Sequence, residues 1–483
     1  MKNRLLSDER IDYIVDTLAD SVYNARIDYD NTISWKLFYH ELFMNDKNVD
    51  TYDTGAIASA ISALCNSKSK RNLYRPAIKK ACELLKKLRN ENGSWSVTSD
   101  LSTSEKQGIV YNSVISLEAL IDAGELDLNE MGPDYLEKSV DFVFETIEWI
   151  YTQRIFKKDT LYYGWGYSGD SENKIYIMPT VNVLISLKRV YFEVATKWKN
   201  KLSEKRIDGK KLLDIINEVQ ESLYSFRISP EIGWGKEITE TNDRIVYTLY
   251  GLYGLVYSVD SIEDIEYPNA KLSDEDVNNF TEMICRWNRK KYFNWNQLDT
   301  LEPEDFFDTY IQKTDSDNNG SCNEIIDHES FFETIAMVSI VEFIKKYKNK
   351  IKKAKQGEIF EVLVKLSIAL KERICIITIN ENYSVVRSRR GLLSQSYPVY
   401  TITQTINALT TLKENKKNIK DLMKYRRWII KGLGFIIQVL GLFIINSFAI
   451  PNTAAYIIIF VSLLAPLSEG LKNWMFNFSE LEE

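Results

Sequence analysis

Hydrophobic positions along most of this chain recur every three or four residues, which is the spacing of one face of an α-helix. Ala60 and Ala63 are small residues at this spacing, and Ser116 and Ala119 repeat the pattern about one unit later. Small side chains on an apolar helix allow neighbouring helices to approach closely. We therefore expect a set of inner helices that pack tightly against one another.

The segments that precede these apolar helices carry charge on one face. Residues 76–90 and 139–154 are examples, and Pro76 suits the first turn of its helix, where a missing N–H has no cost. Amphipathic helices around a more apolar set predict an outer ring around an inner one.

Turns that contain Trp or Gly recur before the apolar helices, which end near positions 64, 120, 190, 255, 340 and 409. Six units of this kind predict a closed α/α barrel, and an open helical solenoid is the alternative. The turns are Ser34-Trp35, Asn92-Gly93-Ser94-Trp95, Gly164-Trp165-Gly166-Tyr167 and Gly233-Trp234-Gly235-Lys236, with weaker versions at 319–322 and 383–386.

Two of these turns, at 92–95 and 164–167, each lead into a helix of small residues and resemble the repeats of the terpene cyclase and protein prenyltransferase superfamily, the α/α toroid. The resemblance covers roughly residues 30–412 and rests on short motifs. It implies an all-α fold, so we predict an α/α toroid of about six helix pairs in residues 1–412, followed by a two-helix transmembrane hairpin.

The hairpin is predicted from residues 432–468, which contain no charged side chain. One helix of this length would extend about 55 Å, well beyond a hydrocarbon core of about 30 Å. Because Pro451 interrupts the run, we expect two membrane helices within 432–474 and a short acidic tail at 475–483. A buried hairpin without a membrane is the alternative.

A basic strip at 413–431 precedes the hairpin, with eight Lys or Arg and two acidic residues. Positive charge beside a first membrane helix stays in the cytoplasm, so the sequence predicts a two-pass protein of the inner cell membrane with a cytoplasmic N-terminal domain. Seven residues of the strip are expected to contact lipid headgroups: Lys416, Lys417, Lys420, Lys424, Arg426, Arg427 and Lys431.

Gly434, Gln438 and Gly441 fall on one face of the first membrane helix. Small residues and a membrane amide favour helix association, so this face is expected to mediate self-association. Packing against the second helix of the same hairpin is the alternative.

The amino-acid composition limits the partners and the kinds of site that we expect. The formal net charge is −7, which argues against a nucleic-acid partner. Only two histidines are present and the five cysteines are scattered, so we expect buried thiols, no metal and no cofactor.

The acidic motifs that the resemblance implies are incomplete. The nearest match to the Asp-x-Asp-Asp motif of class II cyclases is Asp315-Ser316-Asp317-Asn318, and Cys322, Asp327 and His328 do not have prenyltransferase zinc spacing. The sequence therefore leaves open whether the chain is an enzyme. The catalytic candidates are Asp315, Asp317, His328, Glu329 and Glu333.

The functional interpretation is a membrane-anchored toroid that senses a small molecule or a protein. An aromatic cavity wall is expected from Trp95, Trp165, Tyr167 and Trp234. Partners would then be the lipid bilayer and further copies of the chain, as in bacterial antiviral-defence effectors that act on the inner membrane. Alternatives are a membrane-associated isoprenoid cyclase or prenyl-transfer enzyme, and a scaffold that binds protein.

Overall fold

The computed structural model describes residues 5–29, 32–36, 52–99, 108–124, 133–167, 174–191, 205–229, 233–241, 245–257, 272–289, 309–312, 324–327, 331–378, 382–386 and 399–423.

Helices of the described chain form a closed inner ring, made of α2 (Thr54–Asn66), α4 (Val110–Ala123), α6 (Ile177–Arg189), α9 (Ile245–Val256), α11 (Phe331–Tyr347) and α13 (Val399–Glu414). Each packs against the next, and α13 packs back against α2. A solenoid would leave its first and last helices apart, so this closure selects the barrel. The predicted helix ends at 64, 120, 190 and 255 lie within about three residues of the observed ones, whereas those at 340 and 409 lie before the ends at Tyr347 and Glu414.

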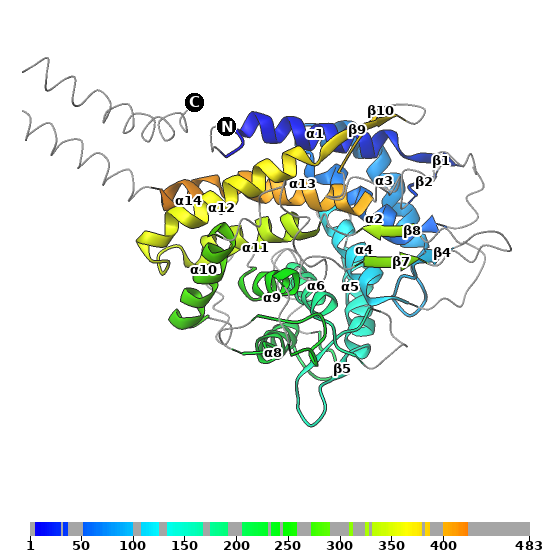
Figure 1. Ribbon diagram of the computed structural model, residues 1–483. Coiled ribbons are helices and arrows are strands. Elements are labelled where there is room, and N and C mark those ends of the chain that lie inside the picture. The colour runs from blue at the N-terminus through cyan, green and yellow to red at the C-terminus, as the bar shows by residue number, and fades with distance from the viewer. Residues whose placement is uncertain are drawn as a thin grey trace, which may run out of the picture.

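An outer layer of amphipathic helices covers the joints of the ring. Its members are α1 (Asp8–Asn24), α3 (Arg71–Lys87), α5 (Pro133–Thr152), α8 (Leu212–Ser225), α10 (Asp274–Arg289) and α12 (Lys353–Glu372). Helix α3 lies against α2 and α4, and α8 lies against α6 and α9. Helix α1 lies against both α2 and α13, so the two ends of the described chain are neighbours (Figure 1).

Small residues explain how α2 contacts two ring helices at once. Ala56, Ala60 and Ala63 have no exposed surface, and the interface needs no larger side chain to fill it. Pro76, by contrast, does not lie in a first turn, because α3 begins five residues earlier at Arg71. Asn72 and Pro76 are both exposed, so water can reach the Asn72 carbonyl that Pro76 leaves without a helical donor.

The expectation of an all-α chain needs one correction. The described part of the chain contains five antiparallel ribbons of two strands each, located in the connections between helices. They are β1 (Ile27–Tyr29) with β2 (Thr32–Ser34), β3 (Tyr52–Asp53) with β4 (Thr98–Ser99), β5 (Ile155–Phe156) with β6 (Tyr163–Gly164), β7 (Thr309–Gln312) with β8 (Glu324–Asp327), and β9 (Ile374–Thr378) with β10 (Asn382–Val386).

Buried tryptophans fasten the outer helices to the turns that follow them. In each case the indole N–H donates to a carbonyl in or near the last turn of the preceding outer helix, at 2.7 or 2.8 Å. We call each such pair a tryptophan junction. The pairs are Trp35 with Val22, Trp95 with Leu85, Trp165 with Ile150, and Trp234 with Leu223.

The same turns also bind the next inner helix. The backbone N–H groups of Trp95, Trp165 and Trp234 donate to a Ser or Thr hydroxyl at 2.9–3.0 Å. The acceptor is always the fourth residue of the inner helix: Ser113, Thr180 or Thr248. Each of these bonds contributes about 1 kcal/mol to stability.

The predicted placement in the inner membrane is wrong. Among the described helices, from Asp8 to Leu422, none is both long and apolar enough to span a bilayer. The hairpin predicted at 432–474 lies outside the described residues.

Candidate ligand-binding site

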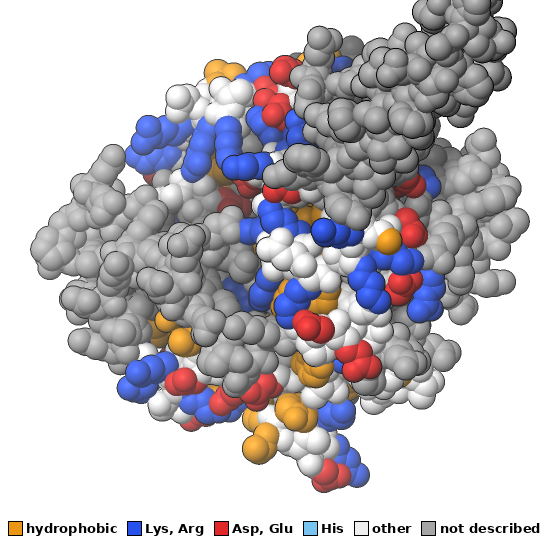
Figure 2. Space-filling model, turned by 90° about the vertical axis from the view of Figure 1, so that its left-hand side faces the viewer, with side chains coloured by type: hydrophobic (Ala, Val, Ile, Leu, Met, Phe, Trp, Pro, Cys, Tyr) orange, Lys and Arg blue, Asp and Glu red, His pale blue; other side chains and the backbone are white. Residues whose placement is uncertain are grey.

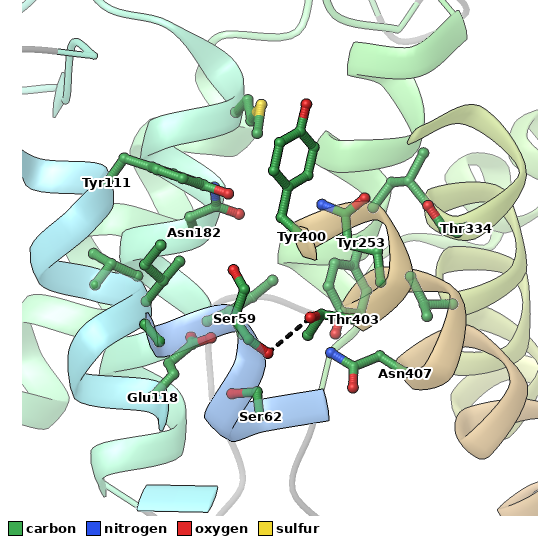
Figure 3. A pocket seen from close by; sticks show the side chains of 18 of the residues that line it. Ser59, Ser62, Tyr111, Glu118, Asn182, Tyr253, Thr334, Tyr400, Thr403 and Asn407 are labelled. Carbon is green, nitrogen blue, oxygen red and sulfur yellow. Dashed lines mark hydrogen bonds between the residues drawn. The ribbon is translucent and has the colours of Figure 1, made fainter. Parts of the chain in front are cut away.

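A cavity of about 190 Å³ lies on the axis of the inner ring. Every helix of the ring contributes to its wall, and the side chains labelled in Figure 3 converge on this space from different helices. Its hydrogen-bonding and charged lining residues are Ser59, Ser62, Tyr111, Glu118, Asp122, Asn182, Arg189, Tyr250, Tyr253, Thr334, Tyr400, Thr403, Gln404 and Asn407.

Tyrosine and amide side chains dominate one end of the cavity. Tyr111 and Tyr400 lie on either side of Asn182 in Figure 3. Burial, together with the nearby Glu118 carboxylate, raises the pKa of Tyr111 to about 12. Its hydroxyl is therefore neutral at physiological pH and can both donate and accept a hydrogen bond.

A charged cluster forms the other end. Arg189 of α6 bonds Asp122 of α4 at 2.6 Å and lies 3.7 Å from Glu118. Ser62 of α2 also donates to Asp122, at 2.6 Å, so three ring helices meet at this carboxylate. The three charged side chains are 14–23% exposed. Their ion pairs hold them in place, and the exposed part of each remains within reach of a ligand.

A second cavity of about 410 Å³ continues from this cluster toward the far end of the ring. The two cavities share Glu118, Asp122 and Arg189 in their walls. The second one adds Tyr257, Glu342, Lys345 and Glu414, among others. We call it the second chamber.

Hydrogen bonds between α2 and α13 hold the cavity wall closed. Thr403 donates to the backbone carbonyl of Ser59 at 2.7 Å, as the dashed line in Figure 3 shows. Asn66 donates to the side chain of Asn407 at 2.8 Å. Both bonds lie beside the cavity, so the contacts that close the ring also shape the site.

The aromatic residues predicted to form the cavity wall are mostly elsewhere. Trp95, Trp165 and Trp234 are fully buried in the tryptophan junctions and do not belong to the cavity lining. Tyr167 lies closer: its hydroxyl is 3.8 Å from the sulfur of Met178, which does line the cavity.

The predicted catalytic residues are not brought together by the described structure. Glu333 is buried at the start of α11, where its carboxylate is paired with Arg373 at 3.3 Å. Neither residue lines the cavity. Asp315, Asp317, His328 and Glu329 lie outside the described residues.

Part of the predicted basic strip belongs to the folded toroid. Helix α13 extends to Glu414, and α14 (Lys416–Leu422) packs against α11 and α12. Lys416 pairs with Asp8, whereas Lys417 and Lys420 are exposed. On the face of the molecule in Figure 2, basic side chains are interspersed with acidic ones.

The remaining residues predicted for lipid or self-contact fall beyond Met423, where the description ends. They are Lys424, Arg426, Arg427, Lys431, Gly434, Gln438 and Gly441.

The described part of the chain was also expected to hold no metal ion. Among its residues, no group of three or more His, Cys, Asp or Glu is placed to hold one. Cys65, Cys82 and Cys285 are buried free thiols, as expected.

Sequence reasoning missed the residues that line the cavity. A signal was present, because polar residues interrupt apolar ring helices at spacings of three, four or seven, as Tyr111, Glu118 and Asp122 do in α4. Such a stripe marks one face of a helix, but it does not say which face meets the ring axis.

Comparison with known proteins supports the fold. No protein-family model and no curated sequence matches the chain. Among solved structures, it is similar to cellobiose 2-epimerase from Bacillus thermoamylovorans B4167, with 11% identity, a TM-score of 0.53, and coverage of 84% of this chain and 100% of that one. It is also similar to a beta-1,3-1,4-glucanase from Paenibacillus sp. X4, with 10% identity, a TM-score of 0.49, and coverage of 86% and 95%.

The epimerase is an α/α-toroid protein, and the ring of this chain has the same architecture. The class is thus an α/α toroid with an axial cavity. A relationship to terpene cyclases in particular is not shown.

Proposed function

We propose that the toroid binds a small, hydroxyl-rich ligand of the carbohydrate class in its axial cavity. The observation that carries the proposal is the convergence of hydrogen-bonding side chains from every ring helix on one small space. Amides and neutral hydroxyls both donate and accept, which suits a ligand that presents many hydroxyls. Tyrosine rings offer apolar faces for the carbon skeleton of such a ligand.

The similar structure of a cellobiose 2-epimerase makes sugars the first ligands to test. The cellobiose 2-epimerase shares the fold of this chain, although its low identity gives no support to a shared activity. The sequence predicts that the toroid senses a small molecule or a protein, and the present proposal specifies a molecule of the carbohydrate class. Antiviral action stays a prediction.

An isoprenoid substrate is less well supported. Glu118, Asp122 and Arg189 line the axial cavity, and a hydrocarbon there would cover charged groups without hydrogen-bonding to them. Removing such groups from water costs several kcal/mol.

Binding is favoured over glycoside hydrolysis. The carboxylates Glu118 and Asp122 lie one turn apart on the same helix and share one guanidinium, that of Arg189. Hydrolysis needs two carboxyl groups that flank the scissile bond. Within the described chain, neither histidine nor cysteine lines the cavity to act as an alternative base or nucleophile.

The test is ligand-observed NMR and calorimetry on the purified full chain with glucose, mannose and cellobiose at millimolar concentration. We expect saturation transfer to at least one of them, and its loss in Asn182→Leu, which replaces a cavity amide by an apolar group. Asn72→Leu is the matched control, because Asn72 is exposed on α3. Absence of binding by all three sugars, or equal binding by the two variants, would overturn the proposal.

A further inference from the structure

The second chamber lies where the inner helices end. Asn66 and Arg189 are the last residues of α2 and α6, Asp122 is the last but one of α4, and Glu414 is the last of α13. Tyr257 directly follows α9. The ring helices therefore run parallel, with their C-terminal ends toward this chamber. Each C-terminus carries a partial negative charge of about half an elementary charge, which favours cations.

Side-chain charges act in the same direction. The first cavity has two carboxylates, Glu118 and Asp122, and one cation, Arg189, which leaves −1. The second chamber adds two carboxylates, each paired with a lysine: Glu342 with Lys345 at 3.5 Å and Glu414 with Lys68 at 2.6 Å, so the count stays at −1. Both cavities thus carry an excess of one negative charge from Glu118, Asp122 and Arg189, and the helix C-termini add to it in the second chamber.

The fold already binds one amine at this end of the ring. The side-chain nitrogen of Lys188, which is 1% exposed, donates to the carbonyls of Gly254 and Tyr257 at 2.8 and 3.1 Å. These carbonyls belong to the C-terminal end of α9, beside the second chamber. The helix ends here accordingly accept hydrogen bonds from an aliphatic amine as well as from backbone donors, while complete burial lowers the pKa of Lys188 well below its usual value.

We propose that the ligand of the axial cavity carries a protonated amine, which the second chamber binds while the hydroxyls occupy the first cavity. This inference rests on the proposed function of the first cavity. The ligand class is an amino sugar or a closely similar aminopolyol. A phosphorylated or carboxylated sugar would meet carboxylates and helix C-termini of the same sign, which opposes its binding.

The experiment compares ligands that differ at one group. Glucose, glucosamine and glucose 6-phosphate are titrated into the purified full chain by calorimetry near neutral pH, at low and high salt. We expect glucosamine to bind at least about fivefold more tightly than glucose, since a hydrogen bond to a charged group contributes roughly 1.5–3 kcal/mol. Glucose 6-phosphate should bind most weakly, and salt should reduce the preference for the amine.

Substitutions of single carboxylates test where the amine binds. Glu118→Gln and Glu414→Gln should each reduce the ratio of glucosamine to glucose affinity. Glu414 is half-exposed, so its substitution is expected to leave folding intact. Glu83→Gln is the matched control, because Glu83 is exposed on the outer helix α3 and should leave the ratio unchanged.

The possible outcomes distinguish failure of the amine inference from failure of the proposed sugar binding. If glucose binds as tightly as glucosamine, the amine inference fails and the proposed function stands. If neither binds, the proposed function fails and the inference fails with it. If glucosamine is preferred but the ratio persists in both Glu118→Gln and Glu414→Gln, the assignment of the amine to the second chamber is overturned.

Discussion

Asn66 at the end of α2 donates a hydrogen bond to the side chain of Asn407 in α13, across 341 positions of the sequence. One turn away from Asn407, Thr403 donates to the carbonyl of Ser59. The ring is thus closed by polar side chains as well as by apolar packing.

Loss of a closing bond should weaken the whole ring. In Thr403→Val the shape of the side chain is kept and its bond to Ser59 is removed, so we expect a loss of about 1 kcal/mol in the free energy of unfolding. Urea denaturation followed by circular dichroism measures it. Thr17→Val is the control, because the half-buried Thr17 donates to Tyr13 within its own helix. Equal midpoints for the two variants would contradict a role in closure.

The tryptophan junctions should depend on the indole N–H. Trp165→Phe keeps an aromatic ring but leaves the Ile150 carbonyl without this donor and creates a small void. We expect a loss of about 2–4 kcal/mol. Leu161→Ala, at an 89% exposed position in the same connection, should change stability by less than about 0.5 kcal/mol. A Trp165→Phe protein as stable as the wild type would show that the bond is dispensable.

Gly251 makes room for the Trp234 junction. A β-carbon at Gly251 would lie 2.4 Å from Cδ2 of the Trp234 ring, which has no space to move in a buried position. We predict that Gly251→Ala destabilises the protein by about 1–3 kcal/mol through overpacking. At Gly55 the nearest contacts would be 3.3 Å, so Gly55→Ala should be milder. Thermal unfolding of both variants provides the comparison, and the opposite order would refute it.

Asp276 should govern stability in acid. It bonds Arg227 at 2.6 Å in a buried pair and caps the start of α10 through Ser273. Burial alone would raise the pKa of Asp276, but the bonds from Arg227 and Ser273 outweigh it and lower the pKa below 3.8. This stabilisation is therefore complete above pH 3.8 and is lost as pH falls through the folded-state pKa.

Asp276→Asn tests this dependence. We expect a loss of about 3 kcal/mol near neutral pH, because a buried guanidinium loses its partner. The difference from wild type should shrink below pH 3.8, which urea titrations at several pH values would reveal. Asp274→Asn serves as the control, since the Asp274 side chain is 86% exposed. A constant difference across the pH range would exclude the proposed linkage.

The order of inner and outer helices followed from sequence because small residues such as Ala60 and Ser116 recur at helical spacing. The C-terminal limit of the toroid did not follow from the sequence. The charges of α14 suggested a membrane surface, yet Ile419 and Leu422 bury that helix against the ring. A net positive charge does not distinguish a helix that pairs with acidic neighbours from one that faces lipid.

The site was harder to predict than the fold, for a physical reason. The sequence predicts Trp95, Trp165 and Trp234 in a cavity wall, but a large apolar ring with one donor is most stable when fully buried with a carbonyl partner. The cavity instead combines side chains such as Tyr111, Asn182 and Tyr400, which meet only when the ring closes. Because these residues lie far apart in the sequence, the sequence does not show that they line one cavity.

The bond between Asn66 and Asn407 also has a consequence for synthesis. At roughly 5–20 residues per second, a ribosome needs about 20–70 s to advance from one to the other. Throughout that interval α2 has no α13 to pack against, and its alanine-rich face stays accessible to other chains. The first ring helix to be made must wait for the last.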